Sequence, residues 1–111
     1  MPQRSYLGEF ELMILLALIR IGDDAYGVPI SKELRNSTGR DVALGSVYAA
    51  LDRLEQKGFV SSTLGDPTPA RGGRAKRYFR VTARGMREVK ATRSALINLW
   101  RGIPQLEGER A

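Results

Sequence analysis

The 111-residue sequence contains no histidine and no cysteine. These absences exclude a Ser-His-Asp triad and a Cys-His pair, because each needs one of the missing residues. They also exclude disulfides and thiol switches, and they remove the usual ligands of zinc, copper and iron. We therefore expect no metal and no cofactor. The carboxylates, lysines, tyrosines and serines that remain show no spacing typical of a catalytic site, so we do not expect an enzyme.

The sequence also lacks a long hydrophobic run. The longest, residues 12–19, is far shorter than the ~20 residues that cross a bilayer. Glu9 and Glu11 precede this run, where a secretory signal peptide would carry positive charge. From these two features we expect a cytoplasmic protein that has no membrane partner.

Positive charge is concentrated in one part of the chain. The sequence has 18 Lys and Arg against 12 Asp and Glu, a net charge of +6. Residues 1–70 carry a net charge of −2 and residues 94–111 carry none, whereas residues 71–93 carry +8. This concentration is typical of a surface that meets a polyanion, but a solvated, Arg-rich helix face gives the same pattern. Charge alone leaves both interpretations open.

The hydrophobic spacing predicts a first helix over residues 8–21 that is apolar on two sides. One stripe comprises Leu7, Phe10, Ile14, Ala17, Leu18 and Ile21, and a second comprises Leu12, Leu15, Leu16 and Ile19. A helix of this kind must be covered on both sides. The second cover is either a partner subunit or, if the helix is central, the rest of the same chain.

Two further helices are predicted over residues 28–38 and 46–57. Pro29 suits the first turn of the earlier helix, and Gly39 suits the left-handed position after its end. Ser46 is a favoured N-cap residue and is predicted to start the later helix.

A β-hairpin and a last helix follow. Residues 59–64 are rich in β-branched side chains, and residues 74–82 alternate between apolar and polar. Residues 65–73 contain the glycines and prolines of a loop between them. Thr82 is a plausible N-cap for a final helix that ends near residue 101.

This order of elements predicts a mainly α protein with a small β-hairpin, namely a winged helix-turn-helix with an appended C-terminal helix. We expect residues 1–82 to bind double-stranded DNA and residues 83–111 to form the appended helix and a short tail. In such a fold the second helix of the helix-turn-helix enters the major groove. Its candidate base contacts are Ser46, Tyr48, Ala49 and Arg53. Serine can bond a base or a phosphate, alanine can contact a thymine methyl, and arginine can bind guanine. We expect Asp52 and Glu55 to lie outside the DNA contacts, with Asp52 paired to a cation.

The segment between the two strands carries the strongest DNA-binding signal. Its candidate DNA contacts are Arg71, Gly72, Gly73, Arg74, Lys76 and Arg77. Small residues allow close approach to a narrow groove, and the cations can bind phosphates or enter the minor groove. A nucleotide-binding loop is the rival interpretation, but no Gly-Lys-Ser/Thr follows and the segment joins a strand to a strand.

Four stretches of the sequence resemble the PadR-like family of bacterial transcription regulators. They are residues 12–19, Tyr26-Gly27 followed by Ile30 and Leu34, residues 44–60, and residues 72–82 followed by Gly85. Residues 44–60 contain Arg53-Leu54-Glu55 and Gly58, which resemble the end of the family's recognition helix. Together the four stretches span about residues 7–100. The family often has proline after the recognition-helix tyrosine, where this chain has Ala49.

The resemblance implies a homodimer that binds a pseudo-palindromic operator, usually as a repressor, and it adds Tyr26 and Gly27 as DNA-binding residues. It also implies the short-tailed branch, in which the first and last helices form the dimer. The expected interface residues are Leu7, Phe10, Ile14, Met86, Val89, Leu96, Ile97 and Trp100.

Some short members of the family have a tryptophan on the last helix that lines a cavity for flat aromatic drugs. Here Trp100 lies about one helical turn later than in that pattern, and Leu96 lies nearer the place. Phe10, Leu96 and Trp100 are therefore candidates for an effector pocket that takes a small aromatic molecule. The other interpretation is that they pack the dimer interface.

A winged-helix module that binds another protein is the alternative function. Such modules often have less basic wings, so the cations of residues 71–77 favour DNA.

Overall fold

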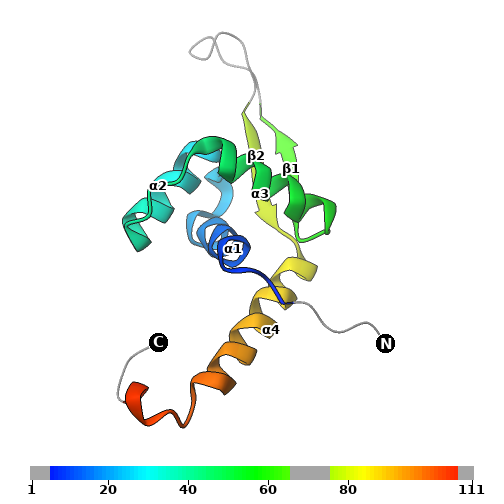
Figure 1. The fold of residues 1–111 in the computed structure, drawn as a ribbon. Helices are drawn as coiled ribbons and strands as arrows, with labels where there is room; N and C mark the ends of the chain where they lie inside the picture. Colours follow the sequence, from blue (N-terminus) through cyan, green and yellow to red (C-terminus); the bar gives the residue numbers. More distant parts are fainter. Residues whose placement is uncertain (1–5, 66–75, 108–111) are drawn as a thin grey trace.

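The computed structural model describes residues 6–65 and 76–107 (Figure 1). Its main elements are α1 (Glu9–Ile21), α2 (Gly27–Thr38), α3 (Leu44–Gln56), β1 (Val60–Leu64), β2 (Arg77–Val81) and α4 (Ala83–Trp100). Short 3-10 helices follow α1 at Gly22–Asp24 and α4 at Pro104–Leu106. The predicted architecture of three helices, a hairpin and a last helix is confirmed.

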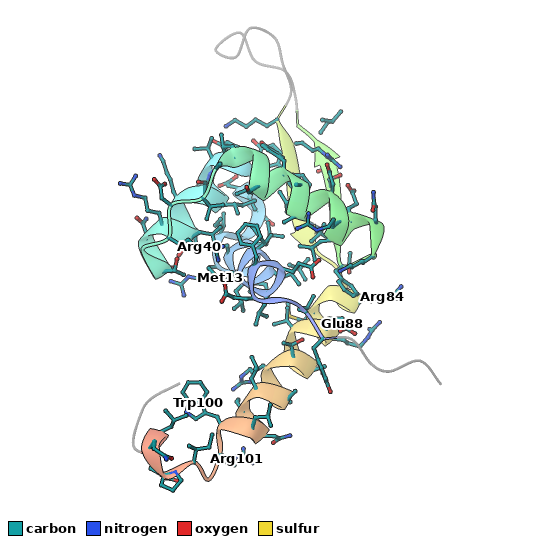
Figure 2. The ribbon with its side chains drawn as sticks, in the orientation of Figure 1. Met13, Arg40, Arg84, Glu88, Trp100 and Arg101 are labelled. Atoms are coloured by element: carbon teal, nitrogen blue, oxygen red, sulfur yellow. The ribbon has the colours of Figure 1, made fainter. Side chains whose placement is uncertain are left out.

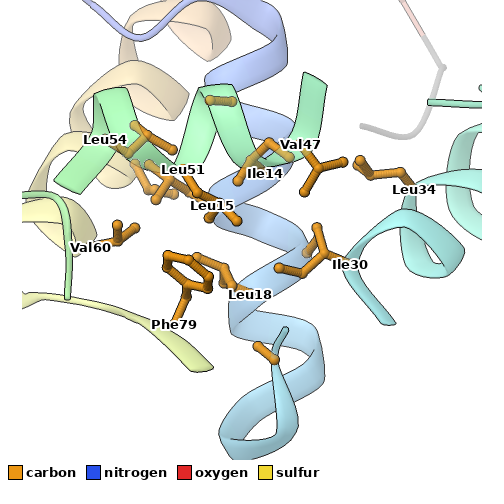
Figure 3. Packing of buried hydrophobic residues seen from close by; sticks show 14 residues of the cluster. Ile14, Leu15, Leu18, Ile30, Leu34, Val47, Leu51, Leu54, Val60 and Phe79 are labelled. Carbon is orange, nitrogen blue, oxygen red and sulfur yellow. The ribbon is translucent and has the colours of Figure 1, made fainter. Parts of the chain in front are cut away.

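Helix α1 lies at the centre of the hydrophobic core (Figure 3). Both of its predicted apolar stripes contribute, since Ile14 from one and Leu15 from the other are completely buried. The residues that surround them are Ile30 and Leu34 of α2, Val47, Leu51 and Leu54 of α3, and Val60 and Phe79 of the strands. Leu16 and Ile19 of the second stripe remain exposed. The described residues therefore cover most of α1 and leave one strip of it uncovered.

The C-terminal end of α2 and the N-terminal start of α3 test two sequence predictions. Gly39 adopts the left-handed conformation after α2, with φ of 75°, and its N–H donates to Arg35 O. That prediction is confirmed. The predicted N-cap at Ser46 is wrong, because α3 begins at Leu44 and is capped by Ala43. The Ser46 N–H already donates to Ala43 O at 3.0 Å, so Ser46 lies inside the first turn.

The hairpin is antiparallel and is attached to the helices at one edge. Val60 pairs with Val81 and Ser62 pairs with Phe79. Alternation along the strands places Val60 and Phe79 in the core. The Phe79 N–H donates to Ala25 O at 2.8 Å, which fixes β2 to the connection between α1 and α2.

Helix α4 begins at a tight junction with the hairpin. As predicted, Thr82 is its N-cap, and the threonine hydroxyl accepts from the Gly85 N–H at 3.0 Å and donates to Gly58 O at 2.7 Å. Gly85 lies so close to the start of β1 that a Cβ atom there would be 2.1 Å from Phe59 O.

Within residues 6–65 and 76–107, the buried residues of α4 all lie in the first ten residues of the helix. Its buried residues are Gly85, Val89 and Thr92, whereas Leu96, Leu99 and Trp100 are exposed. The helix projects from the other elements in Figure 1. The radius of gyration is accordingly 16.2 Å, compared with about 13 Å for a compact chain of this length. Within residues 6–65 and 76–107, no helix is both long and apolar enough to span a membrane.

Candidate nucleic-acid interface

The exposed face of α3 carries the residues that were predicted to contact bases. The inward face is formed by Val47, Ala50, Leu51 and Leu54, which are all completely buried. The opposite face presents Ser46, Tyr48, Ala49 and Arg53, which are exposed. The amphipathic pattern of the sequence therefore gives α3 one side for packing and one side for an external partner.

Tyr48 is held in place by the start of α2 and by β2. Its ring lies over Gly27, where a Cβ atom would be 2.4 Å from the tyrosine hydroxyl. The ring also packs against Phe79, with ring centroids 6.4 Å apart. Gly27 is buried beneath the ring. The absence of a side chain at Gly27 makes room for the Tyr48 ring, and a DNA contact by Gly27 stays a prediction.

A cation and two aromatic rings lie together beside the N-terminus of α2. The Lys76 ammonium is 3.9 Å from the centroid of the Tyr26 ring, and Tyr26 and Tyr78 pack edge to face with centroids 5.7 Å apart. Tyr26 is the N-cap residue of α2. Because the N-terminus of a helix carries partial positive charge, Lys76 and the start of α2 together favour an anion.

Arg77 is turned toward α3 rather than away from the protein. Its guanidinium donates to Asp52 Oδ1 at 3.3 Å, to Glu55 Oε1, and to Ser62 Oγ at 3.1 Å. The expectation that Asp52 pairs with a cation is confirmed. Three of its five guanidinium N–H groups are thus engaged within the protein, and its side chain is 39% exposed, so a phosphate contact by Arg77 stays a prediction.

Four of the predicted wing contacts, Arg71, Gly72, Gly73 and Arg74, lie outside the described residues. Another four cations of the basic stretch, Arg84, Arg87, Lys90 and Arg93, are exposed along α4. The described part of the basic stretch is therefore divided between the hairpin region and a helix face, and both interpretations of the charge stay open.

Comparison with known proteins identifies the fold and the family. A model of the "Transcriptional regulator PadR-like family" matches residues 15–91, which is more than half of the chain. The chain belongs to this family. It is therefore a DNA-binding transcriptional regulator of the winged helix-turn-helix type and not an enzyme.

Individual relatives support the same assignment. An uncharacterized protein from Lysinibacillus sphaericus is 34% identical over 95 residues, which cover 84% of this chain and 80% of that protein. A transcriptional regulator from Clostridium thermocellum is 28% identical, with a TM-score of 0.70 over 87% of this chain and 91% of that one. A PadR family regulator from Clostridium difficile has the same fold, with a TM-score of 0.72 and 23% identity over 91% of this chain and 100% of that one.

This PadR-like regulator has a second candidate site, an apolar groove of about 490 Å³ between α1 and α4. We call it the α1–α4 groove. It is lined by Tyr6, Leu7, Glu9, Leu12, Met13, Leu16, Thr92, Ala95, Leu96 and Leu99. Sequence reasoning missed Leu99, although its position three residues after Leu96 places both on one helix face.

The predicted effector residues do not converge within one PadR-like chain. Leu96 lines the α1–α4 groove, but Phe10 and Trp100 do not. The Phe10 ring lies 5.2 Å from the Arg40 guanidinium. Figure 2 shows Arg40 beside α1 and Trp100 far from it, at the end of α4.

The predicted dimer-interface residues fall into three groups. Ile14 and Val89 are buried in the core of their own chain, so the prediction is wrong for these two. The half-buried members are Leu7, Phe10, Met86 and Ile97. Leu96 and Trp100 are exposed and remain available to a partner. The physical reason is that α1 is central, and the apolar side of α1 that carries Ile14 is already covered by α2 and α3.

Proposed function

We propose that this PadR-like regulator acts as a homodimeric repressor in the bacterial cytoplasm, where its DNA lies. Residues 1–82 would bind the operator, and residues 83–111 would join the two subunits. The observation that carries the proposal is the uncovered apolar surface shared by α1 and α4. Leu99 is 74% exposed, and Leu16, Ile19 and Leu96 are exposed with it. Contiguous apolar surface of this kind marks a protein interface.

A dimer fits the requirements of operator binding. Two copies of α3 related by a two-fold axis read half-sites that are about one DNA turn, or ~34–36 Å, apart. Base contacts from Ser46, Tyr48, Ala49 and Arg53 would supply the sequence preference, and Lys76 with the start of α2 would bind phosphate.

The test begins with the oligomeric state. We expect light scattering after size exclusion to give a dimer for the native protein and a monomer for the double variant Leu96→Glu/Leu99→Glu. Leu64→Glu is the matched control, because Leu64 is 73% exposed but lies at the far end of β1. A monomeric native protein, or a double variant that stays dimeric, would contradict the proposed interface.

The second part of the test is DNA selection from a random pool. We expect the native dimer to recover a two-fold consensus, and the monomeric variant to lose most of its affinity for that sequence. Placed across a promoter in a transcription assay, the consensus should lower transcript yield when the protein is added. A consensus without two-fold symmetry would contradict the dimer, and increased transcription would contradict repression.

We also propose that a small, flat aromatic molecule binds between the two subunits, where the α1–α4 groove of one subunit faces its partner, and relieves repression. The groove volume of about 490 Å³ is in the range of small-molecule sites, and its lining is mostly apolar. Trp100, the only tryptophan, follows Leu99 on α4 and would report binding by fluorescence quenching. Quenching by planar dyes that Leu96→Glu abolishes would support this role. An absence of quenching across a diverse panel would assign Phe10, Leu96 and Trp100 to packing of the dimer.

A further inference from the structure

The guanidinium of Arg77 is bound by acceptors from α3 and β1, while its side chain stays 39% exposed. All three of its nitrogens donate: Nε to Ser62 Oγ at 3.1 Å, Nη1 to Asp52 Oδ1 at 3.3 Å, and Nη2 to Glu55 Oε1. Ser62 completes the cluster, because its hydroxyl donates to Glu55 Oε2 at 2.7 Å. The guanidinium carbon also lies 4.9 Å from the centroid of the Phe79 ring. The side chain is therefore held on several sides in one orientation.

The cluster joins the two parts of the fold that are expected to grip DNA. Asp52 and Glu55 are on α3, the recognition helix, whereas Arg77 is the first residue of β2, at the base of the segment between the strands. A planar guanidinium that donates to several fixed acceptors holds its partners at a defined angle. The contacts thus fix the hairpin relative to α3.

The cluster also changes the charge that α3 presents. The side chains of Asp52 and Glu55 are 58% and 33% exposed, so without a partner they would repel phosphates near the helix. Arg77 offsets part of this charge. The two carboxylates also hold the Arg77 guanidinium, which would otherwise bind the phosphates of any duplex, whatever its sequence.

We propose that Asp52, Glu55 and Arg77 form a clamp that sets the position of the hairpin on the recognition helix. In this clamp Arg77 is a positioning residue and not a phosphate ligand. By holding Arg77, the carboxylates lower the affinity for arbitrary DNA and so raise the preference for the operator. The inference rests on the proposed function, in which α3 and the hairpin bind DNA together.

The dependence of duplex affinity on salt separates this role from phosphate binding. Each phosphate that a cation neutralises steepens the negative slope of log K against log salt by about 0.9, and slopes are compared as magnitudes. The probe is a random-sequence duplex of about 24 base pairs, titrated by fluorescence anisotropy at several salt concentrations. We expect Arg77→Ala to bind more weakly because Asp52 and Glu55 are left unpaired, but with the slope of the native protein. A slope that falls by about 0.9 would show that Arg77 binds phosphate, and it would overturn the clamp.

Releasing the clamp should have the opposite effect. In Asp52→Asn/Glu55→Gln the guanidinium is no longer held, so we expect the slope to rise by up to about 0.9. With that rise, the loss of affinity between 50 and 200 mM salt is three- to fourfold larger for the double variant than for the native protein. The preference for the consensus selected by the native protein over random duplex should fall. A merely structural role for the three residues would leave the slope unchanged, and an unchanged slope with unchanged preference overturns the proposal.

The triple variant Asp52→Asn/Glu55→Gln/Arg77→Ala tests whether the steeper slope of the double variant depends on Arg77. We expect it to recover the affinity that Arg77→Ala loses and to return to the native slope. A slope that stays high would mean that removal of two negative charges is sufficient, which contradicts the clamp. Arg80→Ala is the matched control, since Arg80 is on the same strand and faces Asp23 at 3.7 Å instead of α3.

The outcomes also separate the clamp from the proposed function. One outcome is that the native protein binds duplex DNA and selects a consensus while Arg77→Ala lowers the slope by about 0.9, as loss of a phosphate contact does. In that case only the clamp fails. If the native protein binds no duplex at low salt, the proposed function fails and the clamp fails with it. Thermal unfolding of each variant confirms that the measured differences come from folded protein.

Discussion

The close approach of Gly85 to Phe59 gives a sharp stability prediction. Replacing Gly85 by alanine would place a Cβ atom 2.1 Å from Phe59 O, 2.9 Å from Val81 Cγ1 and 3.0 Å from Phe59 C. Carbon and oxygen normally approach no closer than about 3.3 Å. The start of α4 must therefore move away from the end of α3 and the start of β1 by about 1 Å.

Backbone rather than a flexible side chain resists that movement. Phe59 O already accepts the Thr82 N–H at 3.0 Å, and the Thr82 hydroxyl accepts the Gly85 N–H at 3.0 Å. A shift of α4 would stretch both bonds. Overpacking of this kind costs about 1–3 kcal/mol, and weakening a hydrogen bond costs about 1 kcal/mol more. Alanine regains about 1 kcal/mol of helix propensity, so we expect a net loss of about 1–3 kcal/mol.

The assay is thermal unfolding followed by circular dichroism, with all proteins at one concentration because an oligomer's Tm depends on it. A loss of about 1–3 kcal/mol should lower Tm by about 4 °C or more. Gly45→Ala is the control, because Gly45 is helical and a Cβ there meets nothing within 4 Å. This variant should unfold at or slightly above the native Tm. A Gly85→Ala protein as stable as the native one would refute the reasoning.

Two further predictions follow from side-chain contacts. Gly27→Ala should displace the Tyr48 ring, because the ring atom Cζ would lie 2.6 Å from the new Cβ. Tyr48 is 37% exposed, so its ring can swing outward and Tm should change little. The affinity for the selected consensus should fall at least several-fold. Unchanged affinity in an anisotropy titration would argue against a DNA-contacting role for Tyr48. Ser37→Ala should raise the pKa of Glu33, since the Ser37 hydroxyl and then Arg20 lower the pKa of that exposed carboxyl. A lowered folded-state pKa stabilises the protein above the ordinary carboxyl pKa, and this contribution is lost as pH falls through the folded value. The stability difference between variant and native protein should therefore vanish in acid, and an NMR titration of Glu33 that shows no change would contradict the assignment.

Features governed by neighbouring residues could be read from the sequence. The N-cap at Thr82 and the left-handed Gly39 follow from hydrogen bonds that span three or four residues, and both predictions are confirmed. The alternation that places Phe79 in the core is likewise a local pattern. The N-cap at Ser46 was wrong although it used the same kind of rule, because α3 begins two residues earlier, at Leu44.

Features governed by distant residues could not be read in this way. In the sequence Arg77 resembles the other cations near it, and the carboxylates that hold it are 25 and 22 residues earlier in the chain. Periodicity showed that Ile14 and Val89 lie on apolar faces, but it did not show what covers those faces. Gly27 could be recognised by its resemblance to a family pattern, whereas its packing against Tyr48 required the structure.

The sequence by itself determined the order of helices and strands, the amphipathic faces and the excess of positive charge after residue 70, because local geometry and composition are encoded within a few residues. The tertiary structure decided which apolar surface becomes core and which stays uncovered on α1 and α4. It also decided that Arg77 is held by the recognition helix and that α4 approaches Phe59 closely enough to need a glycine. Such contacts join segments far apart in the chain, so only the packing of the whole fold brings them together.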